Sequence, residues 1–202
     1  MVPQTWNCRS GARRLVVRVT RVYMVRHGRA AAGWDTAVDP SLDELGTKQA
    51  QQVASSLSAL GGMQIVSSPL ARCRETAAPL ASMWNVEVVV EPKVSEIPSP
   101  VGYSMESRVG WLRAAMQGTW SDLDPLYSAY RNAAFDFVAS LKSDTVIFSH
   151  FVAINAILGK ALGDDRVLID SLDNCSVTQF TADGVGNLHV VERGRQADTL
   201  IR

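Results

Sequence analysis

Two kinds of hydrophobic pattern alternate along the chain. Short apolar runs rich in β-branched residues predict strands at residues 14–25, 63–68, 86–92, 145–150, 176–181 and 187–194. Between them, longer segments in which apolar residues recur every three or four positions predict helices over 39–60, 70–84 and 151–162. In the first of these segments the apolar face consists of Ala50, Val53, Ala54, Leu57 and Leu60.

Strands that alternate with helices indicate an α/β protein, a three-layer α/β/α sandwich with a mostly parallel sheet. A turn at Asp183 and Gly184 joins the last two strands into an antiparallel hairpin. We expect one domain over residues 21–202, preceded by an N-terminal extension over residues 1–20. Residues 97–125 follow neither pattern and predict an insertion at one edge of the sheet. Two interpretations of this insertion stay open, a lid over the active site and a packed connector.

The composition is that of a globular protein, with 47% hydrophobic and 20% charged residues in a chain of 202. Lys and Arg together number 20, as do Asp and Glu, so the charge gives no reason to expect nucleic acid or a membrane as a partner. No apolar run has the length of a membrane span, and the first twenty residues lack the pattern of a secretory signal. The three cysteines match neither a disulfide framework nor a zinc site, which favours a cytoplasmic location. The oligomeric state is left open.

Basic side chains follow three of the predicted strands. Arg26 and His27 come directly after the first strand, Arg72 lies shortly after the second, and His150 ends the fourth. In open α/β sheets ligands bind outside the carboxyl ends of the strands, so we expect these side chains to meet. The planar fork of arginine suits phosphate, and an imidazole is a nucleophile, acid or donor near neutral pH. The pattern therefore predicts a phosphoryl site, to which the helix beginning near Phe151 adds free N–H groups.

Four short motifs carry a family resemblance. "RHG" at residues 26–28, "SSPLARCRETA" at 67–77, "SEI" at 95–97 and "FSH" at 148–150 occur in the order seen in the histidine phosphatase superfamily. The chain thus resembles proteins of the phosphoglycerate mutase-like fold from about Val22 to its final strands. The long second motif is the most specific of the four, and the tripeptide "RHG" alone is weak.

The resemblance implies a phosphatase that needs neither metal nor cofactor and acts on a small phosphorylated molecule. His27 would be phosphorylated and then hydrolysed, which divides one difficult transfer into two easier steps. Arg26, Arg72 and His150 would hold the phosphoryl oxygens, and the backbone N–H of Phe151 would assist them.

Glu96 is the candidate acid that protonates the leaving oxygen, because it follows the third strand, where the family often keeps such a group. Glu91 and Glu106 are its rivals in the same part of the chain, and the alternative is that Glu96 is a solvent-facing loop residue. His189 is expected to face solvent and to have no chemical role. Cys73 is expected to serve packing.

Departures from the family pattern bear on the choice of reaction. Arg29 and Ala30 follow "RHG", where many phosphoglycerate mutases have Glu and a small hydroxyl residue, so a phosphatase is favoured. Phe151 stands where the family commonly has glycine, and Asn155 stands where many relatives have arginine. The alternatives are a phosphoglycerate mutase-type phosphotransferase, a protein-phosphohistidine phosphatase and a non-catalytic phospho-ligand binding module. The substrate is left unidentified.

Overall fold

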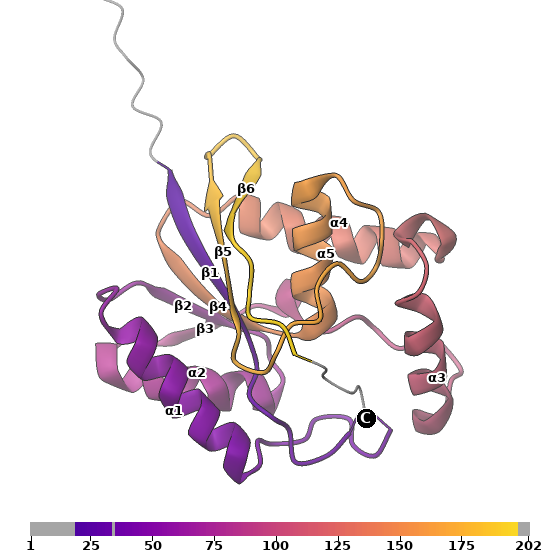
Figure 1. Cartoon of the computed structure of the whole chain (residues 1–202), viewed down its shortest axis with the longest axis horizontal. Coiled ribbons are helices and arrows are strands. Elements are labelled where there is room, and N and C mark those ends of the chain that lie inside the picture. Colours follow the sequence, from indigo (N-terminus) through magenta and orange to yellow (C-terminus); the bar gives the residue numbers. More distant parts are fainter. Residues whose placement is uncertain (1–18, 34, 198–202) are drawn as a thin grey trace, which may run out of the picture.

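A mixed six-stranded sheet forms the centre of the molecule. The computed structural model describes residues 19–33 and 35–197, and its strands lie in the order β3-β2-β4-β1-β5-β6 (Figure 1). The strands are β1 (Thr20–Arg26), β2 (Gln64–Ser67), β3 (Val88–Val90), β4 (Thr145–Ser149), β5 (Val177–Ala182) and β6 (Leu188–Glu192). The start of the first predicted strand and nearly all of the predicted extension, residues 1–18, lie outside the described residues.

The strand directions agree with the prediction of a mostly parallel sheet. β1 and β4, β4 and β2, and β2 and β3 pair in parallel, whereas β5 runs antiparallel to β1 and forms the predicted hairpin with β6. Arg26 pairs with Ser149, and Ser67 pairs with Phe148. The carboxyl ends of β1, β2 and β4 therefore meet at the same edge of the sheet.

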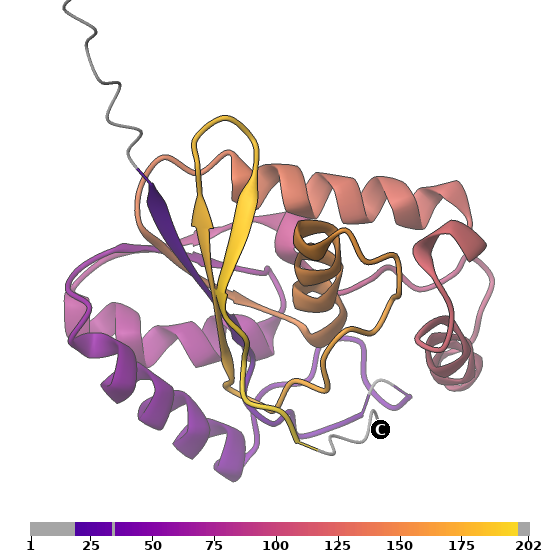
Figure 2. The ribbon, with the colours of Figure 1, turned by 45° about the horizontal axis from the view of Figure 1, so that its top comes forward.

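Helices cover both faces of the sheet (Figures 1 and 2). On one face, α1 (Glu44–Ser58) and α2 (Ala71–Trp84) pack with Tyr23 and Val25 of β1 in one hydrophobic cluster. On the other, α4 (Pro125–Ala139) and α5 (Phe151–Leu162) share a cluster with Val22 and Met24. This division follows from the strand geometry, since successive side chains point to opposite faces. The predicted three-layer sandwich is confirmed.

The segment 97–125 is more regular than its sequence suggests. It contains α3 (Met105–Ala115) and the short 3₁₀ helix η2 (Trp120–Asp122), and the 3₁₀ helix η1 (Pro92–Val94) precedes it. Ser104 caps α3 by accepting a hydrogen bond from the backbone N–H of Ser107. Trp120 is buried, and the Trp111 ring lies 4.9 Å from the ring of Tyr127 on α4. Both tryptophans thus fasten the segment to the rest of the domain. None of the helices in the described ranges is long and apolar enough to cross a bilayer.

Candidate active site

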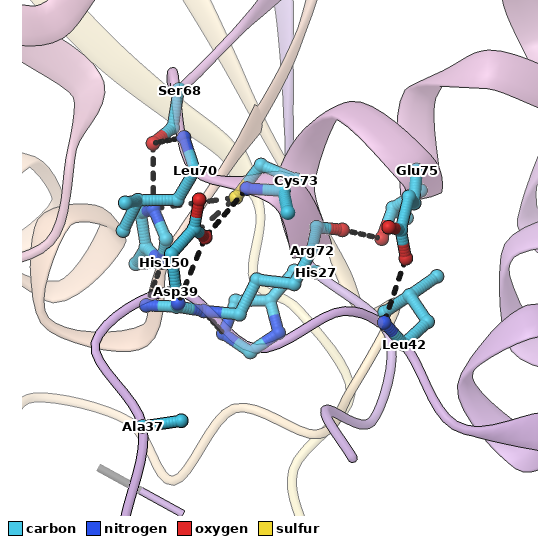
Figure 3. Close-up of polar contacts among 12 residues, drawn as sticks. His27, Ala37, Asp39, Leu42, Ser68, Leu70, Arg72, Cys73, Glu75 and His150 are labelled. Carbon is cyan, nitrogen blue, oxygen red and sulfur yellow. Dashed lines mark hydrogen bonds and ion pairs between the residues drawn. The ribbon is translucent and has the colours of Figure 1, made fainter. Parts of the chain in front are cut away.

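Side chains that follow β1, β2 and β4 converge at the carboxyl edge of the sheet, with Arg72 in the first turn of α2 (Figure 3). The rings of His27 and His150 lie 5.2 Å apart, centroid to centroid. The guanidinium of Arg72 joins them, with Nε 3.3 Å from His27 Nε2 and Nη2 3.2 Å from His150 Nδ1. All three side chains are buried. The sequence prediction that these residues meet is therefore matched by the geometry.

The hydrogen bonds of His27 fix its tautomer. Nδ1 lies 2.7 Å from the carbonyl oxygen of Gly28, which only accepts, so Nδ1 carries the proton. Nε2 is then the unprotonated nitrogen, and it accepts from Arg72 Nε. Burial lowers the pKa of His27 well below its usual value of 6.5, and the charges of Arg72 and Arg26 act in the same direction. His27 is thus a neutral imidazole at pH 7 whose lone pair faces the arginine.

His150 is held in the opposite tautomer. A guanidinium has no acceptor, so Nδ1 accepts from Arg72 and Nε2 carries the proton, which it donates to Ser68 Oγ at 2.8 Å. Cys73 Sγ also lies 3.3 Å from Nε2. Burial, with the charge of Arg72 as the next cause, lowers the pKa of His150 well below 6.5. Cys73 is completely buried, and its pKa is raised by this burial, in agreement with a packing role.

Arg26 is held by the loop that precedes β5. Its Nη1 donates to the carbonyl oxygen of Leu172 at 2.5 Å, and its guanidinium lies 4.9 Å from the ring centroid of Phe151. Burial lowers the pKa of Arg26 to about 10, so it keeps its charge at neutral pH. Within the described residues, Arg26 Nε and Arg72 Nη1 are buried donors that have no hydrogen-bond acceptor. Buried donors without acceptors are costly, and two of them at one site fit an anion.

Asn155 supports this loop from α5. Its side-chain oxygen accepts from the backbone N–H groups of Ile169 and Asp170, and its amide donates to the carbonyl oxygens of Phe151 and Asp170. All four bonding positions of the buried amide are filled. The residue therefore contributes no charge to the site, as expected, but it fixes the loop whose Leu172 carbonyl holds Arg26.

Phe151 contacts the site through its ring, which packs on Arg26. That its backbone N–H donates to phosphate stays a prediction.

Sterics explain why the third residue of "RHG" is a glycine. A Cβ atom on Gly28 would lie 2.6 Å from the carbonyl oxygen of Gly46 on α1. This close approach seats the turn after β1 on α1, and the turn supplies the carbonyl that orients His27.

Glu96 is electrostatically coupled to the cluster. Burial raises the pKa of its carboxyl above the usual 4.5, although the hydrogen bond from Ile97 N and the charges of Arg72 and Arg26 oppose the shift. Of its rivals, Glu91 accepts a hydrogen bond from Lys93 N, and Glu106 is exposed in the first turn of α3. A carboxyl whose pKa is raised beside a phosphoryl site is suited to exchange a proton with the leaving oxygen.

Sequence reasoning missed several supports of the site. Asp39 reaches the N-terminus of α2 from the loop before α1, and the side chain of Asn174 donates to the carbonyl oxygen of His27 at 3.0 Å. Asp39 lies in the loop before α1, where the predicted helical segment 39–60 begins five residues before the helix itself, and Asn174 lies in a loop after α5, so neither belongs to a motif. His189 is exposed on β6, as predicted. In the part of the chain that the structure describes, no group of three or more His, Cys, Asp or Glu is arranged to hold a metal ion.

Residues 22–102 match the sequence profile of the histidine phosphatase superfamily, branch 1. A probable phosphoglycerate mutase GpmB from Proteus mirabilis is 28% identical over 183 residues, covering 79% of this chain and 83% of the relative. The protein of the same name from Erwinia tasmaniensis is 29% identical over 184 residues, with the same coverage of 79% and 83%.

Solved structures share the fold. A mycobacterial glucosyl-3-phosphoglycerate phosphatase superposes with a TM-score of 0.67 at 20% identity, over 86% of this chain and 97% of that one. The same phosphatase has been solved with VO₃. A phosphoserine phosphatase from Entamoeba histolytica, solved with 3-phosphoglyceric acid, gives a TM-score of 0.66 at 20% identity, over 89% and 98% of the two chains. These likenesses confirm the fold expected from the sequence.

Proposed function

We propose that this chain, which belongs to the histidine phosphatase superfamily, hydrolyses a phosphomonoester through a phosphohistidine on His27. The observation that carries the proposal is the neutral His27 ring, whose unprotonated Nε2 lies within 3.3 Å of the Arg72 guanidinium. A nucleophile beside a fixed cation is the arrangement that phosphoryl transfer requires.

In the first step, His27 Nε2 attacks phosphorus, the N–P bond forms and the P–O bond to the leaving group breaks. The Nδ1–H bond to the Gly28 carbonyl stabilises the positive charge that develops on the ring. Arg26 and Arg72 bind the phosphoryl oxygens through their buried donors. The neutral His150 offers its Nε2–H to another oxygen in exchange for Ser68 Oγ. The fixed guanidinium charges supply the electrostatic stabilisation, so the proposed chemistry needs no metal and no cofactor.

Glu96 gives its proton to the leaving oxygen in this step. In the second step water attacks the phosphohistidine, Glu96 takes up the proton of that water, and His27 is released with inorganic phosphate. The raised pKa of Glu96 suits both transfers.

The segment 97–125 is the part of the chain to which we assign substrate selection. Arg108 on α3 is buried and donates to the carbonyl oxygen of Ala37. Burial lowers its pKa, and the charge of Arg72 contributes to this shift, so α3 lies within electrostatic reach of the site. This coupling supports a lid over a small phosphorylated substrate. We propose a cytoplasmic location on the cysteine pattern of the sequence alone.

A phosphoglycerate mutase is the second candidate, because the curated relatives carry that name. The two functions differ in the acceptor of the phosphoryl group, water or a phosphoglycerate. A panel of phosphorylated metabolites with free phosphate as the readout, run beside an assay of 3-phosphoglycerate isomerisation, separates them. If 3-phosphoglycerate is isomerised faster than phosphate is released, the proposed hydrolase function is wrong.

Chelator and vanadate provide a direct test of the proposed chemistry. Excess EDTA is expected to leave the rate of phosphate release unchanged, whereas vanadate, which imitates the five-coordinate phosphorus, is expected to inhibit competitively. A structural neighbour of this chain has been solved with VO₃, which supports the choice of inhibitor. Activity that is lost in EDTA and restored by Mg²⁺ would contradict the mechanism.

Glu96→Gln is expected to act selectively on substrates with a poor leaving group. An alkoxide needs a proton to depart, so alkyl phosphate hydrolysis should slow by roughly 10²-fold or more, the ordinary contribution of general acid catalysis. A nitrophenolate departs unaided, so p-nitrophenyl phosphate should lose little. In the unchanged protein, the rate on the alkyl substrate should fall as pH rises through the elevated Glu96 pKa, because the donor is then deprotonated.

Glu106→Gln is the matched control, since Glu106 is exposed on α3. If Glu96→Gln loses a small and equal part of the rate on both substrates, Glu96 is a loop residue without a catalytic role.

A further inference from the structure

Asp39 places a carboxylate at the edge of the phosphoryl site. Its Oδ1 accepts a hydrogen bond of 2.7 Å from the backbone N–H of Ala71 in the first turn of α2. The same oxygen lies 4.0 Å from Arg72 Nη1 (Figure 3). The Asp39 side chain is 39% exposed, whereas that of Arg72 is 5% exposed. One oxygen atom thus faces both a helix N-terminus and a buried guanidinium.

The N-terminus of α2 and the Arg72 guanidinium together form a site suited to an anion, and the Asp39 carboxylate lies beside it. Helix N-termini and guanidinium groups are the two structures that bind phosphate oxygens most readily. Arg72 Nη1 is buried and has no hydrogen-bond acceptor in the described part of the chain, because 4.0 Å is too long for a hydrogen bond. The Asp39 carboxylate therefore contributes its field to Arg72 but leaves the Nη1 donor available.

We propose that Asp39 is an internal competitor for phosphate, a carboxylate that weakens the binding of inorganic phosphate and so promotes product release. The inference rests on the proposed function, since it needs the phosphoryl group to bind at Arg72. A phosphate bound there is a second anion beside the first, and like charges a few ångströms apart repel. A site built from two guanidiniums would otherwise retain its product.

Two other roles of Asp39 make different predictions. If Asp39 only caps α2, removing its charge leaves phosphate affinity unchanged, because an amide oxygen also accepts from Ala71 N. If Asp39 instead positions Arg72, removing the charge weakens phosphate binding. Competition is the one role in which the affinity rises, so the sign of the change decides among the three.

The test is isothermal titration of the full chain with inorganic phosphate, together with inhibition constants for phosphate and vanadate. Asp39→Asn keeps the shape and the cap and removes the charge, and we expect about tenfold tighter phosphate binding, the size expected for one partly exposed like charge. Asp39→Ala should tighten binding in the same direction but melt at a lower temperature, because the cap is lost.

Asp136→Asn is the charge-matched control. Asp136 is 72% exposed on α4, where its partner Lys160 lies on α5, ten residues after His150 and so roughly 15 Å along the helix. Its phosphate affinity should equal that of the unchanged protein. Unchanged or weaker binding in Asp39→Asn overturns the inference.

Arg72→Ala separates this failure from a failure of the proposed function. If phosphate binds the unchanged protein and Arg72→Ala abolishes that binding, the phosphoryl site stands whatever Asp39→Asn shows. If Arg72→Ala binds phosphate as well as the unchanged protein does, the site is elsewhere, and both the proposed function and the inference fail.

Discussion

Replacement of His27 by alanine is expected to abolish turnover and the covalent intermediate together. Nε2 of this ring forms the N–P bond, and a methyl side chain has no atom to take its place. We expect the rate to fall by at least about 10⁴-fold, which corresponds to about 5.5 kcal/mol of transition-state stabilisation. Brief incubation of the unchanged protein with a ³²P-labelled substrate should leave a phosphate that is labile in acid and stable in base, and His27→Ala should show none.

His189→Ala provides the control, because His189 is exposed on β6, outside the site. It should retain both the label and the activity. A second measurement uses pH. Since burial and the two arginines lower the pKa of His27 well below 6.5, its nitrogen stays unprotonated below pH 6.5, and kcat/KM should persist there. A His27→Ala variant that keeps near-normal activity would exclude the phosphohistidine.

The sheet and three of its helices could be predicted because local pattern and tertiary structure agree. The run at residues 145–150 has the apolar centre Val146, Ile147 and Phe148, and β4 is buried along its whole length in the interior of the sheet. α1 begins after Asp43, whose side chain accepts from Gly46 N, and its buried face is the one that the spacing indicates. In such elements each residue favours the structure that it adopts.

The helix α4 was missed although its signals are present. Asp124 caps it, Pro125 occupies its first turn, and Tyr127, Phe135 and Val138 are buried on one face. Exposed apolar residues on its other face, such as Leu126, blur the helical period, and the hydrophobic pattern predicts no element between residues 126 and 144. α3 gave a weaker signal although Ser104 caps it, because its buried face contains the charged Arg108 beside Val109, Leu112 and Ala115.

In the candidate site, too, the residues could be predicted from the sequence, whereas their protonation and their backbone partners could not. His27, Arg72 and His150 lie in motifs at strand ends, and the topology of a parallel sheet brings such ends together. Their tautomers and pKa shifts were beyond the sequence, because they depend on the Gly28 carbonyl, on Ser68 and on complete burial. The Leu172 carbonyl that holds Arg26 lies 146 residues away in the chain, and a backbone carbonyl has no signature in a sequence.

Replacement of Arg72 is expected to cause the second largest loss of rate. Unlike the loss in Glu96→Gln, this loss should be the same for good and poor leaving groups. Its three nitrogens have different tasks. Nε contacts the nucleophile, Nη2 contacts His150, and Nη1 is a buried donor without an acceptor among the described residues. Arg72→Ala removes the charge on the phosphoryl group itself, so alkyl and aryl phosphates should both slow by about 10³-fold, as when a preorganised oxyanion donor is lost.

Arg72→Lys tests whether the charge alone suffices. An ammonium is a point charge that cannot direct three donors from one plane, so we expect activity to recover only partly, with a loss of about 10²-fold on both substrates. Arg74→Ala, an exposed change two residues along the same helix, should leave the rates unaltered, and thermal melts of all three variants exclude unfolding as the cause. If Arg72→Ala spares p-nitrophenyl phosphate while it slows the alkyl ester, Arg72 acts on the leaving group and the phosphoryl group is bound by other residues.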